Sequence, residues 1–286
     1  MRTIPRRLSL WAAGIVALCL SSLVFGPSAA GIAPVRTPPI TSALDADKIA
    51  ARLALELRIV APARIQSVDH VISMYYAAIG GYEALKAVKS RRMRGIYTEG
   101  TLRATTDIAW ARPAQRRVNV HAPGFEYSEG FDGSTWEYDF QAKSFKRDSG
   151  AAADAGRRGA EFDESFVDYR AKGHRVVLLG VDSVRARETF HLRVTLADGW
   201  VKEYYFDTKT HLIVALRKAM PIHARGPVVA SLSYYEDWRR TGTLIQPYAL
   251  VEREATSGRL MTTLQWDVIE SNPVLLQSEL QPPTQE

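Results

Sequence analysis

The chain has 286 residues, of which 46% are hydrophobic and 24% are charged, and its formal net charge is +6. Its lysines and arginines are scattered among acidic residues and form no basic stripe, so the composition argues against a nucleic-acid partner. The only cysteine, Cys19, lies in an apolar N-terminal stretch, which leaves the rest of the chain without disulfides, thiol catalysis or iron–sulfur clusters.

Residues 1–30 have the pattern of a secretory signal peptide. A basic start precedes an almost wholly apolar run at 8–25, and Ser28, Ala29 and Ala30 supply the small residues that a signal peptidase reads. An uncleaved membrane anchor is the alternative, because the run is close to the shortest length that spans a bilayer. The small residues favour cleavage, so we expect the protein to be exported.

Residues 31–65 are predicted to form a linker with a possible peripheral helix. Three prolines between Gly31 and Ser42 indicate an extended tether. Ser42 can cap the helical pattern that follows, and Pro62 ends it. The apolar residues of this pattern repeat every three or four positions, at Ile49, Leu53, Leu57 and Val60.

A clearer helix is predicted to follow Ser67, which can act as its cap. Asp69 suits the positive end of a helix, and Gly80 with Gly81 stops the pattern. Its broad apolar face consists of Val68, Val71, Ile72, Tyr75, Tyr76 and Ile79. Residues 83–88 add a further turn or two.

From Arg91 to Ile269 the sequence predicts about ten or eleven strands. Apolar and polar residues alternate at 189–196 and at 260–268, so these strands have one apolar and one wet face, as in an antiparallel sheet. Turn signals such as Asp132-Gly133 separate the strands. A twisted sheet of this size curls into a full or half barrel, and its inner face is filled by its own side chains, by a helix or by a guest.

One segment, residues 148–173, interrupts the strands. It lacks alternation and is rich in alanine, glycine and charged residues. It is either a mobile loop or a short helix with flexible flanks, and long insertions of this kind are often functional lids. We predict a lid.

Local marks of catalysis or metal binding are missing from the sequence. The six histidines are isolated, and no H-E-x-x-H, G-x-S-x-G, P-loop or G-x-G-x-x-G motif occurs. We therefore predict no catalytic residues, no metal site and no cofactor. A hydrolase site assembled from distant carboxylates, such as Asp139 and Glu203, stays open as an alternative.

Large aromatic side chains recur on the apolar faces of the predicted strands. In the stretch 129–140, Trp136, Tyr138 and Phe140 share one face of a strand, and we predict that this face is the wall of a cavity. An ordinary packed core is the alternative for any one of these residues. Nine residues are predicted to line a ligand-binding cavity: Tyr75, Trp110, Tyr127, Trp136, Tyr138, Tyr204, Phe206, Tyr234 and Trp266.

Five segments with turn and strand signatures lie between Gln66 and Ile269: YYAAIGGYEALKAVKSRRMRGIY, GFDGSTWEYD, FDESFVDYRAKGHRVVLLG, YYFDTKTHLIV and YYEDWRRTGTLIQPYALVE. They resemble those of the outer-membrane lipoprotein-sorting-like proteins of the LolA/LolB superfamily. The resemblance implies a mainly β fold with some α, a half-open antiparallel β-barrel closed by short helices. The resemblance covers the domain that we place at 66–270 and expect to bind lipid, and the signal peptide at 1–30, the linker at 31–65 and a flexible tail at 271–286 lie outside it.

The resemblance also implies a function. Carrier members shelter the acyl chains of lipoproteins that cross the periplasm, and related members sense envelope stress by binding a partner protein. A carrier arginine helps to hold the closed form, and Arg92, Arg94 and Arg103 are equal candidates for it here. We predict a periplasmic, non-enzymatic carrier or binder of lipid or lipoprotein acyl chains, whose membrane contact is at most transient. A protein-interaction or stress-sensor module and a hydrolase are the alternatives.

Overall fold

The computed structural model describes residues 66–223 and 226–283. The predicted signal peptide and the linker with its possible helix lie outside these residues. Thirteen strands form one antiparallel sheet in the order β6-β5-β4-β3-β2-β1-β13-β12-β11-β10-β9-β8-β7. The strands are β1 (Ser90–Glu99), β2 (Leu102–Ala111), β3 (Gln115–Ala122), β4 (Phe125–Phe131), β5 (Thr135–Asp139), β6 (Ser144–Arg147), β7 (Arg175–Val184), β8 (Arg187–Thr195), β9 (Val201–Asp207), β10 (Ile213–Met220), β11 (Val229–Thr241), β12 (Leu244–Glu254) and β13 (Leu260–Ser271).

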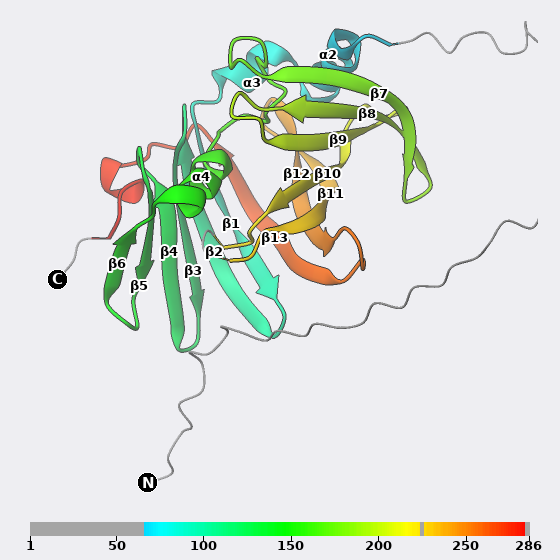
Figure 1. The fold of residues 1–286 in the computed structure, drawn as a ribbon. Coiled ribbons are helices and arrows are strands. Elements are labelled where there is room, and N and C mark those ends of the chain that lie inside the picture. Colours follow the sequence, from blue (N-terminus) through cyan, green and yellow to red (C-terminus); the bar gives the residue numbers. More distant parts are fainter. Residues whose placement is uncertain (1–65, 224–225, 284–286) are drawn as a thin grey trace, which may run out of the picture. The chain divides into compact units, whose positions relative to one another are not determined.

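The sheet curls into two walls that face each other (Figure 1). Strands β1–β6 form one wall, strands β7–β12 form the other, and β13 joins them through its pairing with β1 and β12. The edge strands β6 and β7 do not pair, so the barrel is half open. This confirms the predicted mainly β, half-open antiparallel barrel, with more strands than the ten or eleven expected.

Helix α2 (Val68–Ile79) fills the inner side of the wall formed by β7–β12. The side chain of Ser67 accepts a hydrogen bond from the His70 N–H at 3.1 Å, and Gly80 ends the helix in the left-handed region with φ 115°, which confirms the predicted helix. A Cβ on Gly80 would lie 2.2 Å from the Thr243 carbonyl oxygen, so the helix end requires glycine. The apolar face packs in one core cluster with Leu192, Tyr204, Phe206 and Leu244. A short helix α3 (Tyr82–Ala87) follows.

The segment predicted as a lid has two parts. Helix α4 (Gly150–Gly159) packs against β4 and β5. The loop after it, residues 160–173, places Phe162, Phe166 and Val167 in the same core cluster as α2. Phe166 is fully buried, so this loop is part of the packed domain.

Residues after β13 pack on the outer face of the first wall. Glu279, in the short 3-10 helix η1 (Gln277–Glu279), forms a 2.5 Å ion pair with Arg92, and Leu280 is buried. Arg117 donates hydrogen bonds to the Ser278 and Gln281 carbonyl oxygens. The segment predicted as a flexible tail therefore makes specific contacts as far as the structure describes it.

Candidate ligand cavity

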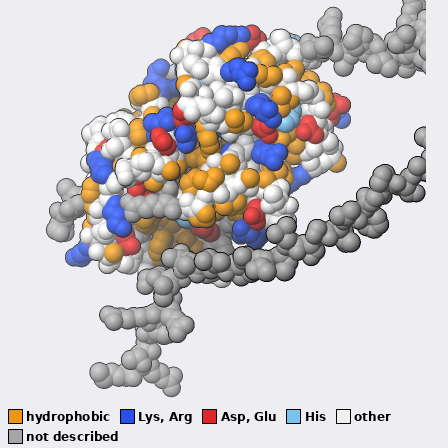
Figure 2. Space-filling model, viewed as in Figure 1, with side chains coloured by type: hydrophobic (Ala, Val, Ile, Leu, Met, Phe, Trp, Pro, Cys, Tyr) orange, Lys and Arg blue, Asp and Glu red, His pale blue; other side chains and the backbone are white. Residues whose placement is uncertain are grey.

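A cavity of about 440 Å³ lies between the first wall of the sheet, helix α4, the loop 160–167 and strands β10–β13. Figure 2 shows hydrophobic side chains gathered in this hollow, with lysines and arginines spaced around it. Strand alternation decides which side chains face inward. On β13, for example, Leu264 and Trp266 line the cavity, whereas Gln265 and Asp267 are exposed. The apolar lining includes Tyr75, Met93, Ile108, Trp110, Leu216, Tyr235, Leu250, Leu264, Trp266 and Ile269.

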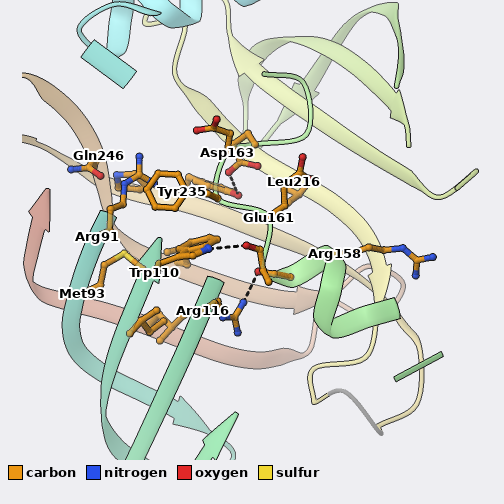
Figure 3. Close-up of a pocket in the computed structure, with 18 of the residues that line it drawn as sticks. Arg91, Met93, Trp110, Arg116, Arg158, Glu161, Asp163, Leu216, Tyr235 and Gln246 are labelled. Carbon is orange, nitrogen blue, oxygen red and sulfur yellow. Dashed lines mark hydrogen bonds between the residues drawn. The ribbon is translucent and has the colours of Figure 1, made fainter. Parts of the chain in front are cut away.

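Hydrogen bonds from the first wall hold α4 and the loop over the cavity (Figure 3). The Trp110 indole N–H donates to the Ala160 carbonyl at 2.8 Å, and Arg116 donates to the Gly159 carbonyl at 2.6 Å. Thr135 on β5 donates to the Ala153 carbonyl at 2.9 Å. The Gly159 and Ala160 carbonyls lie at the C-terminal end of α4, where carbonyl groups have no partner within the helix, so these two bonds tie the end of α4 to the first wall.

Asp163 ties the covering loop to the rest of the domain. Its carboxylate accepts two hydrogen bonds from Arg112 and one from Lys86 at 3.1 Å, and its side chain is only 5% exposed. Burial disfavours the charged carboxylate, but the hydrogen bonds and charges of Arg112 and Lys86 outweigh burial and lower the pKa of Asp163 below its ordinary value. The loop is therefore attached by a charged side chain that stays ionised.

Most other charged side chains of the cavity wall form ion pairs. Arg116 pairs with Glu129 at 3.1 Å, and Glu161 pairs with Lys172 at 2.6 Å. Lys218 pairs with Glu252 at 3.4 Å. Arg158 at the rim pairs with Asp198 at 2.9 Å. The polar part of the wall is thus largely neutralised by its own residues.

Two cations and one carboxylate of the wall form no ion pair within the described ranges. The Arg91 guanidinium lies over the Phe162 ring at 4.9 Å, and burial lowers the pKa of Arg91. Buried Lys202 donates to the Ser165 hydroxyl at 2.8 Å, and burial lowers its pKa as well. Glu164 accepts from the Tyr204 and Tyr235 hydroxyls at 2.9 and 3.0 Å.

Three of the nine residues predicted from the sequence line the cavity: Tyr75, Trp110 and Trp266. Tyr204 and Phe206 lie on the inner side of the sheet, but they pack in the core against the Phe166 ring, at 5.0 and 5.3 Å between ring centroids, and do not line the cavity. Tyr127 shares the inner face of β4 with Glu129 and lies outside the cavity lining.

Trp136 and Tyr138 correct the prediction for β5. Thr135 and Glu137 line the cavity, so the intervening Trp136 and the following Tyr138 point to the opposite face. Trp136 is fully buried there and packs beside Gly130, its partner on β4. The glycine leaves room for the indole ring, since a Cβ at this position would lie 2.4 Å from it. A glycine opposite a tryptophan indicates that the aromatic ring packs closely against the neighbouring strand, but it does not tell which face of the sheet is the outer one.

Tyr234 also lies on the outer face, and its ring is covered by the Arg185 guanidinium at 3.5 Å. Its neighbour Tyr235 is the one that lines the cavity. The sequence offers two adjacent tyrosines at this point, so alternation alone leaves their assignment open by one position. Residues that the sequence analysis missed include aliphatic Met93, Ile108 and Leu264, since it favoured aromatic side chains.

The structure does not bring together Asp139 and Glu203, the distant carboxylates considered for a hydrolase site. Asp139 accepts a hydrogen bond from the Ala142 N–H in its own hairpin, and Glu203 pairs with Arg193 at 2.7 Å. Within residues 66–223 and 226–283, no group of three histidine, cysteine or acidic side chains is arranged to hold a metal ion. No helix of the described part is long and apolar enough to cross a membrane.

Comparison with solved structures identifies the fold. The structure aligns with a DUF1329 family protein from Desulfovibrio piger at 10% identity, over 76% of this chain and 98% of that chain, with a TM-score of 0.54. A LolA superfamily protein from Nitrosomonas europaea aligns at 10% identity over 76% and 98% of the two chains, with a TM-score of 0.50. A putative outer membrane lipoprotein-sorting protein domain from Vibrio parahaemolyticus aligns at 11% identity over 73% and 94%, with a TM-score of 0.45.

No protein-family model and no curated protein matches the sequence. The structural likeness at these identities concerns the fold, and it confirms the LolA-like architecture that the turn and strand signatures predicted.

Proposed function

We propose that the protein is an exported, non-enzymatic carrier or binder that holds a lipid or lipoprotein acyl chain in the cavity between the two walls of the sheet. The observation that carries the proposal is the cavity itself, which lies beside a floor of apolar side chains such as Met93, Ile108 and Leu264. The likeness in fold to a LolA superfamily protein supports the same function. The predicted signal peptide supports a periplasmic location.

The energy of burial favours an acyl chain as the guest. Each methylene removed from water contributes about 0.8 kcal/mol, so ten methylenes contribute about 8 kcal/mol before the cost of ordering the chain. No hydrogen bond is needed for this contribution. A cavity that binds by apolar contact alone does not require a catalytic cluster.

The size of the cavity suits one chain. Its 440 Å³ equals the liquid volume of about 15 water molecules, and a methylene group occupies a similar volume. It lies in the lower part of the range for small-molecule pockets. Cargo with several acyl chains would require α4 and the loop 160–173 to move away from the first wall.

Two neighbouring residues of β13 provide a matched test. Leu264 lines the cavity, whereas Gln265 is exposed on the opposite face. We expect Leu264→Asp to weaken the binding of a fluorescent fatty acid tenfold or more, because a carboxylate would be placed beside the chain, and Gln265→Asp to have little effect. Titration of both variants, after a check of their circular dichroism spectra, measures this. Equal affinities would contradict an apolar site on this face.

The exposed edge strand of the second wall supports a second candidate function, the binding of a partner protein. On β7 the apolar side chains of Val177, Leu179 and Val181 are 38%, 44% and 57% exposed, and one side of this strand has no neighbour in the sheet. An unpaired edge can accept a strand from another protein. If the protein purified without detergent has a bare mass in native mass spectrometry and takes up no fatty acid, the interaction module is favoured. Ester turnover that is lost on changing one cavity carboxylate would favour the hydrolase.

A further inference from the structure

Arg91 stands apart from the other charged residues of the cavity wall. It lies on β1, next to the cover loop, and its guanidinium points into the cavity beside the Tyr235 ring (Figure 3). The guanidinium also lies over the face of the Phe162 ring, at 4.9 Å from its centroid. A guanidinium keeps its charge at any physiological pH, so the cavity contains a permanent positive charge without an ion-pair partner.

The nearest carboxylates do not neutralise Arg91. Asp163 is already bound by Arg112 and Lys86, so two cations share its charge. Glu164 is held by the hydroxyl groups of two tyrosines. Both carboxylates act on Arg91 electrostatically, but neither forms an ion pair with it. An unpaired charge that is partly removed from water is costly, and the cost falls when an anion binds to it.

A second donor lies close to Arg91. Figure 3 shows the Gln246 side chain of β12 beside the Arg91 side chain. Gln246 is 7% exposed and lines the cavity. The Nε2 atom of Gln246 and the Nε atom of Arg91 are buried and have no hydrogen-bond acceptor among the described residues. Buried donors in proteins nearly always have an acceptor, and an oxygen-bearing group bound in the cavity would supply one for this part of the wall.

We infer that the cavity selects an amphiphile with an anionic head group, a carboxylate or a phosphate, which Arg91 and Gln246 bind while the apolar tail lies along Met93, Ile108 and Leu264. This inference rests on the proposed function and specifies its ligand. A planar guanidinium with a neighbouring amide suits both kinds of head group, because both present two oxygens that accept parallel hydrogen bonds.

Head-group selectivity in one variant series tests the inference. Hexadecanoic acid, hexadecyl phosphate and hexadecanol carry the same tail, and their affinities can be measured by displacement of the neutral dye Nile red. We expect the wild-type protein to bind at least one of the two acids about tenfold or more tightly than the alcohol, because a hydrogen bond to a charged group contributes about 1.5–3 kcal/mol. Whichever acid binds more tightly identifies the source of the head group.

Two substitutions separate a binding role from a structural one. Arg91→Gln should remove the preference for the acid while leaving the affinity for hexadecanol within about threefold, and Arg91→Lys should keep part of the preference. Arg175→Gln, an exposed arginine of β7, serves as the control. The preference is a ratio measured within one variant, so partial unfolding does not change it.

The outcomes distinguish a failure of the head-group inference from a failure of the proposed carrier function. Equal affinity for acid and alcohol in the wild-type protein, or an undiminished preference in Arg91→Gln, would overturn the inference and leave the proposed carrier function in place. Failure of all three compounds to displace the dye would overturn the proposed function itself.

Discussion

At the residue scale, Asp163 links the cover of the cavity to two separate elements. Arg112 follows β2 and Lys86 lies in α3, so one carboxylate joins both to the loop 160–173. Because this carboxylate is buried, the bonds are shielded from water and salt. Asp163 is thus a buried ionised group that adds to the hydrogen bonds from Trp110 and Arg116 in attaching this loop.

Asp163→Asn is expected to lower the free energy of unfolding by about 3 kcal/mol at pH 7, because it leaves the Arg112 charge without its partner. The pKa of Asp163 is lowered in the folded protein, so its contribution is present above the unfolded pKa of about 3.9 and is lost as the pH falls through the folded value. Urea unfolding at pH 7 and pH 3 measures both effects. The exposed Asp154→Asn is the control, and a difference between wild type and Asp163→Asn that persisted unchanged at pH 3 would contradict this account.

Single residues were the hardest feature to predict from the sequence. The alternation in β5 was recognised correctly, but which of its two faces is the inner one depends on the partner strands. Thr135 and Glu137 face inward because α4 packs against Thr135 and because Gly130 makes room for Trp136 on the other side. A shift by one position exchanges the two faces of a strand, so the same local pattern permits either assignment.

At the scale of elements, a bulge in β13 interrupts its pairing with β1 at the centre of the sheet, because Asp267 has no partner between Val268 and Trp266. The register between β1 and β13 shifts at Arg94 and Gly95. Gly95 is required there, since a Cβ would lie 2.0 Å from the Gln265 carbonyl oxygen. The two walls meet along this pair of strands, and the bulge therefore helps to position the cavity between them.

Gly95→Ala is expected to destabilise the protein by about 2 kcal/mol or more, because backbone atoms of β13 would have to move. Gly159→Ala in α4 is the matched control, since the nearest atom to its added Cβ is the flexible end of Arg116 at 3.3 Å, and alanine favours helix. Thermal unfolding of both variants tests this prediction. A Gly95→Ala variant as stable as Gly159→Ala would show that the bulge tolerates a side chain.

The helices and strands were predicted from the sequence more accurately than the individual residues that line the cavity. The cap and stop signals around α2 predicted it correctly, because Ser67 and Gly80 act locally. Alternation predicted an antiparallel sheet but too few strands, since β6 has only four residues and gives little periodic signal. The helix within the interruption was foreseen as one of two options, whereas the burial of Phe162 and Phe166 depends on contacts with α2 that no local pattern reveals.

At the scale of the whole domain, the cavity exists because the two walls are filled differently. Helix α2 and the loop 160–173 pack the second wall into a dense core, whereas the inner face of the first wall is covered by α4 and leaves a space of about 440 Å³. A curled sheet with a period of two was predictable from the sequence. Which wall is filled was not, because it depends on where α2 docks.

Quenching of tryptophan fluorescence by a fatty acid brominated in mid-chain tests most directly whether an acyl chain lies in this cavity, since bromine quenches only at contact distance. Trp110, Trp238 and Trp266 line the cavity, whereas Trp136 and Trp200 do not. We predict saturable quenching by one equivalent of the acid, much reduced when the three cavity tryptophans are replaced by phenylalanine and retained in Trp136→Phe and Trp200→Phe. Quenching that persists without the cavity tryptophans, or no quenching at all, would contradict the account.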